Sequence, residues 1–212
     1  MAFRFRAFRV LVDGAPGTGK SSFAQRHCAG AFEDARAPST ATEVYPLMVY
    51  TTSGPVLFDV WVMPGDERYA RPMAFYECAQ ALLAFFDATR PETIGPALAA
   101  IAENPGLLSV LCGNKADAGA GAHCLRVPGS PSFTAFTAIS VKTGYNVDAP
   151  FLALARGLMG DPALEYCQTA SPLGVAPGGL APKWPQIAPA GPVSRAAARV
   201  SKRLSSKRFV RA

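Results

Sequence analysis

The stretch from Phe8 to Ser21, FRVLVDGAPGTGKS, decides the fold of this chain. Its first part, Phe8 to Asp13, is rich in β-branched and aromatic residues and predicts a strand. Its second part, Gly14 to Ser21, has the spacing G-x-x-x-x-G-K-[ST] and is followed by a helix-like stretch. A glycine-rich turn that only caps a helix has a similar composition. The position between a strand and a helix favours a loop that binds phosphate groups.

In such a loop, successive backbone N–H groups point toward the phosphates, and the glycines permit positive φ angles and close approach. We expect Lys20 to neutralise the β- and γ-phosphate charge and Ser21 to ligate Mg²⁺ through its Oγ atom. The nucleotide contacts predicted in this segment are Gly14, Ala15, Pro16, Gly17, Thr18, Gly19, Lys20, Ser21 and Ser22.

Strand-like and helix-like stretches alternate beyond this loop. The predicted strands are 8–13, 44–52, 56–62, 81–87, 107–113 and 133–139, and the predicted helices are 20–28, 69–78, 92–103 and 150–159. Alternation of this kind predicts a largely parallel sheet with helices on both faces. The link TSGP between the second and third strands is too short for a crossover, so these two strands form a hairpin. The prediction is an α/β fold with a six-stranded, mostly parallel sheet and one antiparallel edge strand.

The composition divides the chain into a domain at 1–166, a linker at 167–192 and a basic tail at 193–212. Residues 1–165 contain 13 basic and 15 acidic residues, whereas the eight basic residues beyond them have no acidic counterpart. The stretch 171–192 contains six prolines and four glycines, which disfavour a helix or a central strand. The five cysteines show no C-x-x-C spacing, which favours a reducing, intracellular setting, and no apolar run reaches membrane-spanning length.

The tail itself admits several interpretations. Val193, Ala197, Val200 and Leu204 recur at helical spacing among basic residues, which indicates a short amphipathic helix. Its basic pairs would suit a nuclear localisation signal, contact with nucleic acid or binding to an anionic membrane. A disordered end that only aids solubility is the alternative.

Two further motifs predict a purine site. GNKAD, residues 113–117, follows an apolar strand, and ISVKTG, residues 139–144, follows another. Asn114 can bond the purine edge, Lys115 can lie over the ring, and Asp117 can accept from two guanine donors that adenine lacks. Ser140, Val141 and Lys142 are placed to offer a backbone N–H to the guanine carbonyl. Together with the phosphate loop, these motifs indicate a guanine nucleotide, GTP or GDP, with Mg²⁺.

The chain here resembles the small GTPases, and within them the Ran group. The matching segments are RHCAGAFE (26–33), EVYPL (43–47), GPVLFDVW (54–61), VLCGNKAD (110–117), GYN (144–146) and PFLALARGLMGDPALEY (150–166). The resemblance implies a phosphate-loop GTPase fold and a monomer that shuttles between nucleus and cytoplasm as the switch of nuclear transport. It also implies importin-type and exportin-type receptors and Ran regulators as partners.

The stretch VMPGDE, residues 62–67, departs from the Ran pattern D-T-A-G-Q-E. Val62 replaces an aspartate that helps to hold the Mg²⁺ shell, and it cannot accept a hydrogen bond. Metal would then depend on Ser21, the phosphates and a hydroxyl from Ser39 or Thr40, so weaker nucleotide retention is expected. Asp66 stands at the position of the catalytic glutamine.

A glutamine amide can both accept from the attacking water and donate toward the phosphate, whereas Asp66 only accepts and adds negative charge. Hydrolysis is therefore expected to be weak or lost. Gly65 keeps the backbone N–H that would contact a γ-phosphate, while Pro64 restricts the segment. Arg36 could act on the phosphates in cis, although a solvated loop arginine has the same appearance.

Two other departures bear on partners. The segment after the NKAD motif keeps only Arg126 of Ran's basic stretch, and the acidic C-terminus of Ran is replaced by the basic SKRLSSKRFVR (201–211). His123 and Cys124, in the segment after the NKAD motif, lack further ligands for a metal site. Three hypotheses follow: a Ran-like switch with defective hydrolysis that serves or competes for transport factors, a non-catalytic domain that presents the basic tail, and a GTPase that depends on a partner's catalytic groups.

Overall fold

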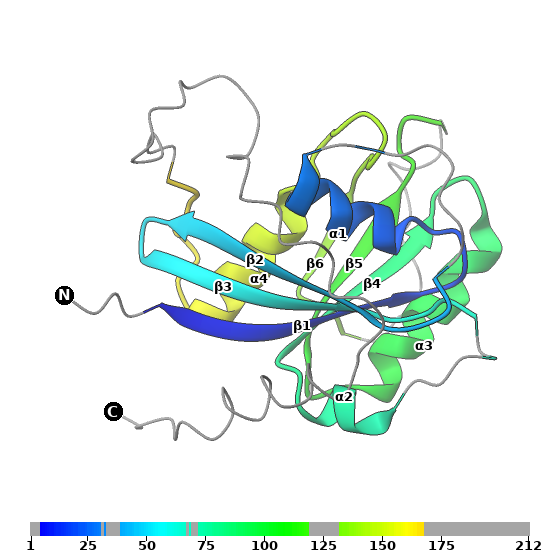
Figure 1. The fold of residues 1–212 in the computed structure, drawn as a ribbon, viewed down its shortest axis with the longest axis horizontal. Helices are drawn as coiled ribbons and strands as arrows, with labels where there is room; N and C mark the ends of the chain where they lie inside the picture. The colour runs from blue at the N-terminus through cyan, green and yellow to red at the C-terminus, as the bar shows by residue number, and fades with distance from the viewer. Residues whose placement is uncertain are drawn as a thin grey trace.

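Six strands form one sheet in the order β2-β3-β1-β4-β5-β6 (Figure 1). The computed structural model describes residues 5–30, 32, 39–66, 68, 72–118 and 132–167. The strands are β1 (Arg6–Gly14), β2 (Glu43–Thr51), β3 (Gly54–Val62), β4 (Ala81–Asp87), β5 (Leu108–Asn114) and β6 (Ala135–Ala138). All neighbouring strands are parallel except β2 and β3, so the predicted antiparallel edge strand is confirmed.

The turn of the β2–β3 hairpin lies at the end of the sheet opposite the phosphate loop. Its strands pair from Glu43 opposite Val62 to Thr51 opposite Gly54. Because β3 runs parallel to β1, the hairpin turn that precedes β3 lies near the beginning of β1 rather than near its carboxyl end (Figure 1). Gly54 has a φ of 104° there, a backbone conformation that favours glycine.

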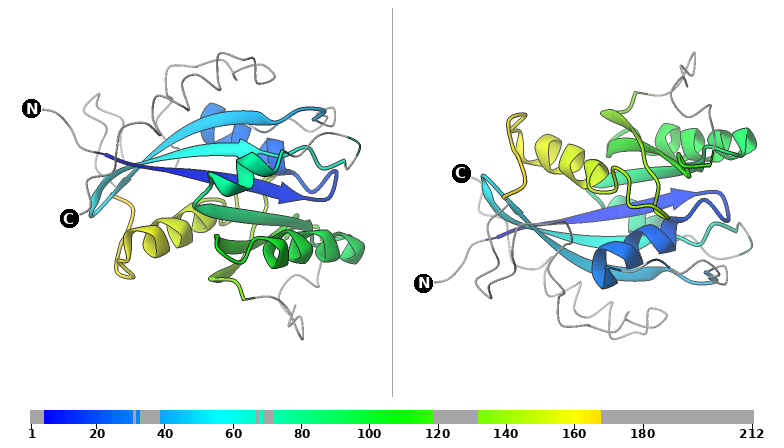
Figure 2. Two further views of the ribbon diagram at one scale, coloured as in Figure 1. Left: turned by 90° about the horizontal axis from the view of Figure 1, so that it is seen from below. Right: turned by 90° about the horizontal axis from the view of Figure 1, so that it is seen from above.

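Helices cover both faces of the sheet. The described helices are α1 (Lys20–Ala29), α2 (Met73–Glu77), α3 (Ile94–Glu103) and α4 (Ala149–Met159), with a 3₁₀ turn η1 (Pro91–Thr93) before α3. Side chains of α1 and α4, among them Phe23 and Phe151, pack in one buried cluster, and α2 and α3 contribute to the cluster on the other face. The two views of Figure 2 look onto these faces, with α2 nearer the viewer on the left and α1 on the right.

The helix predicted at 69–78 is wrong in its extent. The described helix begins at Met73, directly after Pro72, which has an extended backbone (φ −60°, ψ 125°). A proline in a helix interior removes one hydrogen bond and clashes with the preceding turn, so Pro72 suits the helix start and not the middle. Residues 69–71 lie outside the described part of the chain, as do Arg36, His123, Cys124 and residues 168–212.

The segment after α4 returns to the β2–β3 hairpin. The N–H of Thr52 donates to the carbonyl of Glu165 at 3.0 Å, and the N–H of Cys167 donates to the carbonyl of Tyr50 at 2.9 Å. The last described residues, up to Cys167, therefore lie beside the turn of the hairpin, at the far end of the sheet from the phosphate loop. No helix among the described residues is long and apolar enough to cross a membrane.

Candidate nucleotide-binding site

The carboxyl ends of the parallel strands bring the predicted motifs to one edge of the sheet. The phosphate loop follows β1, and the segment 63–66 follows β3. Asp87 ends β4, Asn114 ends β5 and Ser140 follows β6. Ligands in open α/β sheets bind at this edge, because the connecting loops converge there. Motifs that are separated by more than a hundred residues in the sequence thus become neighbours.

The phosphate loop is shaped by glycines and by its own lysine. Gly17 and Gly19 have φ angles of 71° and 93°, and Gly19 is the N-cap of α1 without a side-chain cap. The first N–H groups of α1 can therefore face an anion. Lys20, only 6% exposed, donates from Nζ to the carbonyls of Gly14 at 2.7 Å and Ala15 at 2.9 Å. Its ammonium group thus lies against the loop.

Gly65 lies directly against this loop. A Cβ atom at Gly65 would be 2.7 Å from Nζ of Lys20 and 2.8 Å from Cα of Pro16. Any residue with a side chain at position 65 would therefore force the phosphate loop or this segment to shift. The segment after β3 is thereby placed beside the lysine that is predicted to contact the β- and γ-phosphates.

Asn114 connects three parts of the site. Its Nδ2 donates to the carbonyl of Thr18 at 2.8 Å, and its Oδ1 accepts from the N–H of Val141 at 3.0 Å. A Cβ on Gly19 would be 2.2 Å from Nδ2 of Asn114, so the loop passes close to this amide. The sequence assigned Asn114 to a purine edge, and the structure adds that it joins the phosphate loop to the loop after β6.

An open hollow of about 390 Å³ lies beside these residues, lined by Ala116, Asp117, Thr143 and Tyr145. Oδ1 of Asp117 accepts from Oγ of the fully buried Ser140 at 2.5 Å, which orients the carboxylate. From α1, Nη1 of Arg26 donates to the carbonyl of Val141 at 2.7 Å. The loop after β6 is therefore held against α1 and against the residues of the NKAD motif.

The three amides proposed for the guanine carbonyl differ in their availability. The N–H of Ser140 donates to the carbonyl of Tyr145 at 2.9 Å, and the N–H of Val141 donates to Asn114. Within the described part of the chain, Lys142 is the one of the three whose N–H has no protein acceptor. Of the three predicted contacts, the amides of Ser140 and Val141 are thus already used within the protein.

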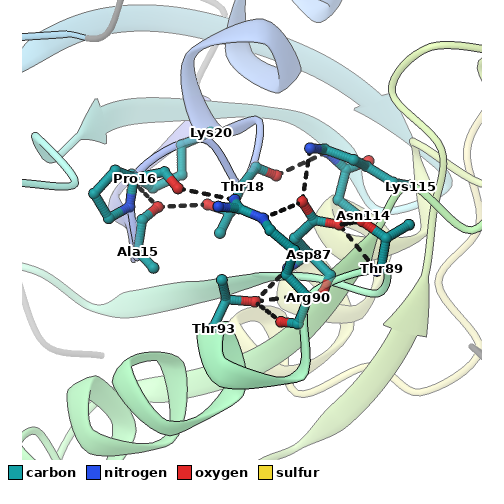
Figure 3. Close-up of polar contacts among 10 residues, drawn as sticks. All are labelled: Ala15, Pro16, Thr18, Lys20, Asp87, Thr89, Arg90, Thr93, Asn114 and Lys115. Atoms are coloured by element: carbon teal, nitrogen blue, oxygen red, sulfur yellow. Dashed lines mark hydrogen bonds and ion pairs between the residues drawn. The ribbon is translucent and has the colours of Figure 1, made fainter.

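Asp87 is the centre of a polar network next to the phosphate loop (Figure 3). Its side chain is fully buried, and Oδ2 pairs with Nζ of Lys115 at 2.6 Å and with Nε of Arg90 at 2.8 Å. Oδ1 accepts from the N–H and the hydroxyl of Thr89 at 3.0 and 2.6 Å. Burial alone would raise the pKa of Asp87, but the hydrogen bonds from Lys115, Thr89 and Arg90 lower it to about 2.

The network reaches the phosphate loop through Arg90. Its Nη2 donates to the carbonyl of Pro16 at 3.0 Å, and a Cβ on Gly17 would be 3.2 Å from the same nitrogen. Figure 3 shows the guanidinium between Asp87 and the loop. Asp87 therefore orients both a lysine predicted to cover the base and an arginine that contacts the phosphate loop.

Replacement of Asp87 with asparagine is expected to lower the free energy of unfolding by about 2 kcal/mol at pH 7, because two cations lose their buried anion. The pKa of Asp87 is depressed in the folded state. Its contribution is therefore present above about pH 4 and is lost as the pH falls toward 2.

Urea denaturation at pH 7 and pH 3 would measure the contribution of Asp87 to the free energy of unfolding. Replacement of the exposed Glu92 with glutamine is the control. The difference between wild type and Asp87→Asn should shrink at pH 3. An equal difference at both pH values would contradict the assignment.

Ser21, the predicted metal ligand, lies beside one of the two candidate hydroxyls. Its Oγ is 2.7 Å from Oγ of Ser39, whereas Thr40 is exposed. Oγ of Ser39 in turn donates to Oε1 of Glu43 at 3.2 Å. Hydroxyl and carboxylate oxygens are donors that Mg²⁺ accepts, so the residues present fit this ion.

Val62 and Asp66, the two residues that depart from the Ran pattern at the metal and water positions, lie in different environments. Val62 is fully buried in the cluster that contains Phe23 of α1. Asp66 accepts from Arg68 through both carboxylate oxygens, with Nε–Oδ1 and Nε–Oδ2 distances of 3.0 Å. The side-chain and backbone hydrogen bonds from Arg68 lower the pKa of Asp66 to about 2. The carboxylate is consequently ionised at neutral pH.

A phosphate loop followed by a helix, at the carboxyl edge of a mostly parallel sheet, defines a phosphate-loop nucleotide-binding protein. The family model described as the Ras family matches residues 9–159, so the chain belongs to the Ras family. It is a small GTP-binding protein, and members of this family bind GTP or GDP and typically Mg²⁺.

Four residues that shape the site were not indicated by any of the sequence motifs: Arg26, Glu43, Asp87 and Arg90. One signal was available for Asp87, because a carboxylate that follows the wholly apolar run ALLAFF at a parallel strand's end belongs to the same edge as the phosphate loop. No phosphate or base motif contains Arg26, Glu43 or Arg90. Arg26 and Arg90 contact the carbonyls of Val141 and Pro16, which are far away in the sequence, and the position of Glu43 opposite Val62 depends on strand register.

Proposed function

We propose that the chain is a Ran-like member of the Ras family that acts in, or interferes with, the GTP-dependent switch of nucleocytoplasmic transport, with GTP hydrolysis impaired at Val62 and Asp66. The observation that carries the hydrolytic part is the environment of Asp66. Its two carboxylate oxygens accept from Arg68, and it lies one residue after the glycine that touches Lys20.

An ionised Asp66 is poorly suited to the role of a glutamine at this position. It offers no hydrogen to the phosphoryl oxygens, and its charge opposes the negative charge that develops in the transition state. Pairing with Arg68 partly neutralises the charge but also directs the carboxylate toward the arginine. The buried Val62 adds a second defect, since its side chain has no oxygen for a metal-bound water.

Mg²⁺, when bound, would neutralise phosphate charge at this site. The chain's own residues then have distinct tasks. Lys20 faces the phosphates, Ser21 and Ser39 offer hydroxyl oxygens, and Asp117 reads the guanine edge. A nucleotide bound in this way would be retained in its triphosphate form longer than in a GTPase with an intact catalytic stretch.

The transport role is supported by the segment 150–166, the most specific part of the resemblance to Ran. Its last residues pair with the hairpin: Tyr166 forms a bridge with Thr51, and its hydroxyl donates to the carbonyl of Asp148 at 2.8 Å. The end of the predicted domain is thus held at the hairpin turn, far from the phosphate loop. This arrangement would let the nucleotide edge and the opposite end of the domain engage different partners, in nucleus and cytoplasm.

The test is the nucleotide that purified protein releases on denaturation, together with single-turnover hydrolysis of GTP in Mg²⁺. We expect bound GTP and a hydrolysis rate at least tenfold below that of an ordinary Ran assayed in parallel. Bound GDP with ordinary turnover would refute the defect. Turnover restored only by a GTPase-activating protein would indicate that a partner supplies the missing groups.

The receptor part needs a separate measurement. Protein loaded with a non-hydrolysable GTP analogue should bind importin-type and exportin-type receptors more tightly than protein loaded with GDP. Equal binding in both states, or none, would remove the transport role while leaving the nucleotide chemistry untouched.

The charge distribution favours a second candidate, a non-catalytic domain that presents its basic tail to nucleic acid or an anionic membrane. All eight charged residues beyond Glu165 are basic. Deletion of residues 193–212 should then abolish binding to DNA, RNA or anionic vesicles, and that binding should weaken steeply with salt. Unchanged binding after the deletion would exclude this candidate.

A further inference from the structure

We infer that Glu43 supplies the carboxylate of the Mg²⁺ site in the place where Val62 has none. The inference rests on the proposed nucleotide and metal site, but not on the hydrolytic defect or the transport role. It assigns a metal-directed function to a residue outside the phosphate loop and outside the stretch 62–67.

Strand register places Glu43 beside the missing carboxylate. Glu43 is the first residue of β2 and pairs directly with Val62, the last residue of β3. Directly opposed residues in an antiparallel pair project from the same face of the sheet. Val62 packs in the cluster that contains Phe23 of α1, so this is the face that α1 covers. A carboxylate at position 43 or 62 therefore lies on the face of the sheet that is covered by α1, the helix that carries Ser21.

A chain of hydrogen bonds leads from Glu43 to the phosphate loop. Oε1 of Glu43 accepts from Oγ of Ser39 at 3.2 Å, and Oγ of Ser39 is 2.7 Å from Oγ of Ser21. Ser39 uses its one hydroxyl hydrogen toward Glu43, so the hydroxyl of Ser21 is the donor in its contact with Ser39. Three oxygens of the kind that Mg²⁺ prefers are thus consecutive neighbours.

Tyr45 fixes the other carboxylate oxygen. Its hydroxyl donates to Oε2 of Glu43 at 2.9 Å, and its side chain is 4% exposed within the core. Groups that orient a metal-directed carboxylate from behind are a regular feature of metal sites. Oε1 of the half-buried Glu43 is thereby turned toward the two serines.

The donor set suits a hard cation. No group of three or more His, Cys, Asp or Glu side chains among the described residues could hold a metal ion by itself. One carboxylate with two hydroxyls, completed by phosphate oxygens and water, is a set typical for Mg²⁺ with a nucleotide and unlike the nitrogen and sulfur sets of Zn²⁺.

The competing explanation for the Glu43–Ser39 hydrogen bond is a purely structural role of Glu43. Glu43 could serve only to keep Ser39 in position, in which case its effect on nucleotide binding would not depend on metal. The two explanations differ in one measurable quantity, the ratio of the nucleotide release rate in EDTA to the rate in excess Mg²⁺.

The experiment measures release of a fluorescent GDP analogue from the full chain in excess Mg²⁺ and in EDTA, for wild type, Glu43→Gln and Glu103→Gln. Glutamine keeps the size and one oxygen of Glu43 but removes the charge. We expect Glu43→Gln to accelerate release about 10-fold to 100-fold in Mg²⁺ and to leave the rate in EDTA unchanged. Glu103, exposed at the end of α3, provides the matched control and should change neither rate.

Equal acceleration in both solutions, or release from wild type that does not respond to Mg²⁺, would overturn the inference. Mg²⁺ titrations of GDP-loaded protein give a second readout, in which the midpoint for Glu43→Gln should move to a higher concentration. Both measurements use GDP and require no hydrolysis. Normal GTP turnover in wild type would therefore refute the proposed defect without affecting this result.

Discussion

Replacement of Asn114 with alanine is expected to weaken guanine-nucleotide binding by about thirtyfold or more. The side-chain amide of Asn114 donates to the carbonyl of Thr18 and accepts from the N–H of Val141, at 2.8 and 3.0 Å, and Asn114 is 3% exposed. Alanine would leave two buried backbone groups without these partners, at a cost of about 1 to 3 kcal/mol each. A total of about 2 to 6 kcal/mol corresponds to at least thirtyfold in a dissociation constant.

The loss should appear in nucleotide affinity because the bonds of Asn114 join two loops of the site and not two core elements. Fluorescence titration with a GDP analogue would measure the affinity. Asn104→Ala is the matched control, since Nδ2 of Asn104 also donates to a backbone carbonyl, that of Ala100 at 2.8 Å, but at the end of α3. An affinity for Asn114→Ala within threefold of wild type would contradict the bridging role.

The double replacement Val62→Asp with Asp66→Gln is expected to raise the rate of GTP hydrolysis by about a hundredfold. Glutamine at position 66 restores a group that both accepts and donates, and removes an anion from beside the phosphates. Aspartate at position 62 restores an acceptor for the metal's water shell. Loss of one well-placed polar group at a reacting centre typically costs about 10²- to 10³-fold, which sets the scale of the gain.

Val62 is fully buried, so an aspartate there will destabilise the fold unless the metal compensates for it. Val60→Asp is the matched control, because Val60 lies two residues earlier in β3, is 1% exposed and belongs to the same cluster. The melting temperature of Val62→Asp should rise with Mg²⁺ and GDP more than that of Val60→Asp. Single-turnover assays that show no gain for the double variant would refute the assignment of the defect.

The order and type of the elements could be predicted because each depends on local pattern. The run ALLAFF and the alternation of strands and helices specify a buried parallel sheet, and the short link TSGP specifies a hairpin. Element ends were less predictable. The helix at 69–78 failed at Pro72, where a single proline outweighed an otherwise helical pattern.

Within the site, the sequence by itself determined the phosphate loop and the NKAD motif, because the chemistry of each lies within a few consecutive residues. Only the tertiary structure decided what surrounds them. Asp87 meets Lys115 and Arg90 because parallel strands end at one edge, and Arg90 then reaches the carbonyl of Pro16.

Glu43 illustrates the same division for the metal site. The sequence shows that Val62 lacks an oxygen, and the short link TSGP predicts the hairpin but not the exact register that pairs residues 43 and 62. Their juxtaposition is set by the register of the β2–β3 hairpin, and a shift of one residue would turn Glu43 to the opposite face. Local motifs identify a nucleotide-binding protein, whereas the groups that orient and charge its site follow from strand register and packing.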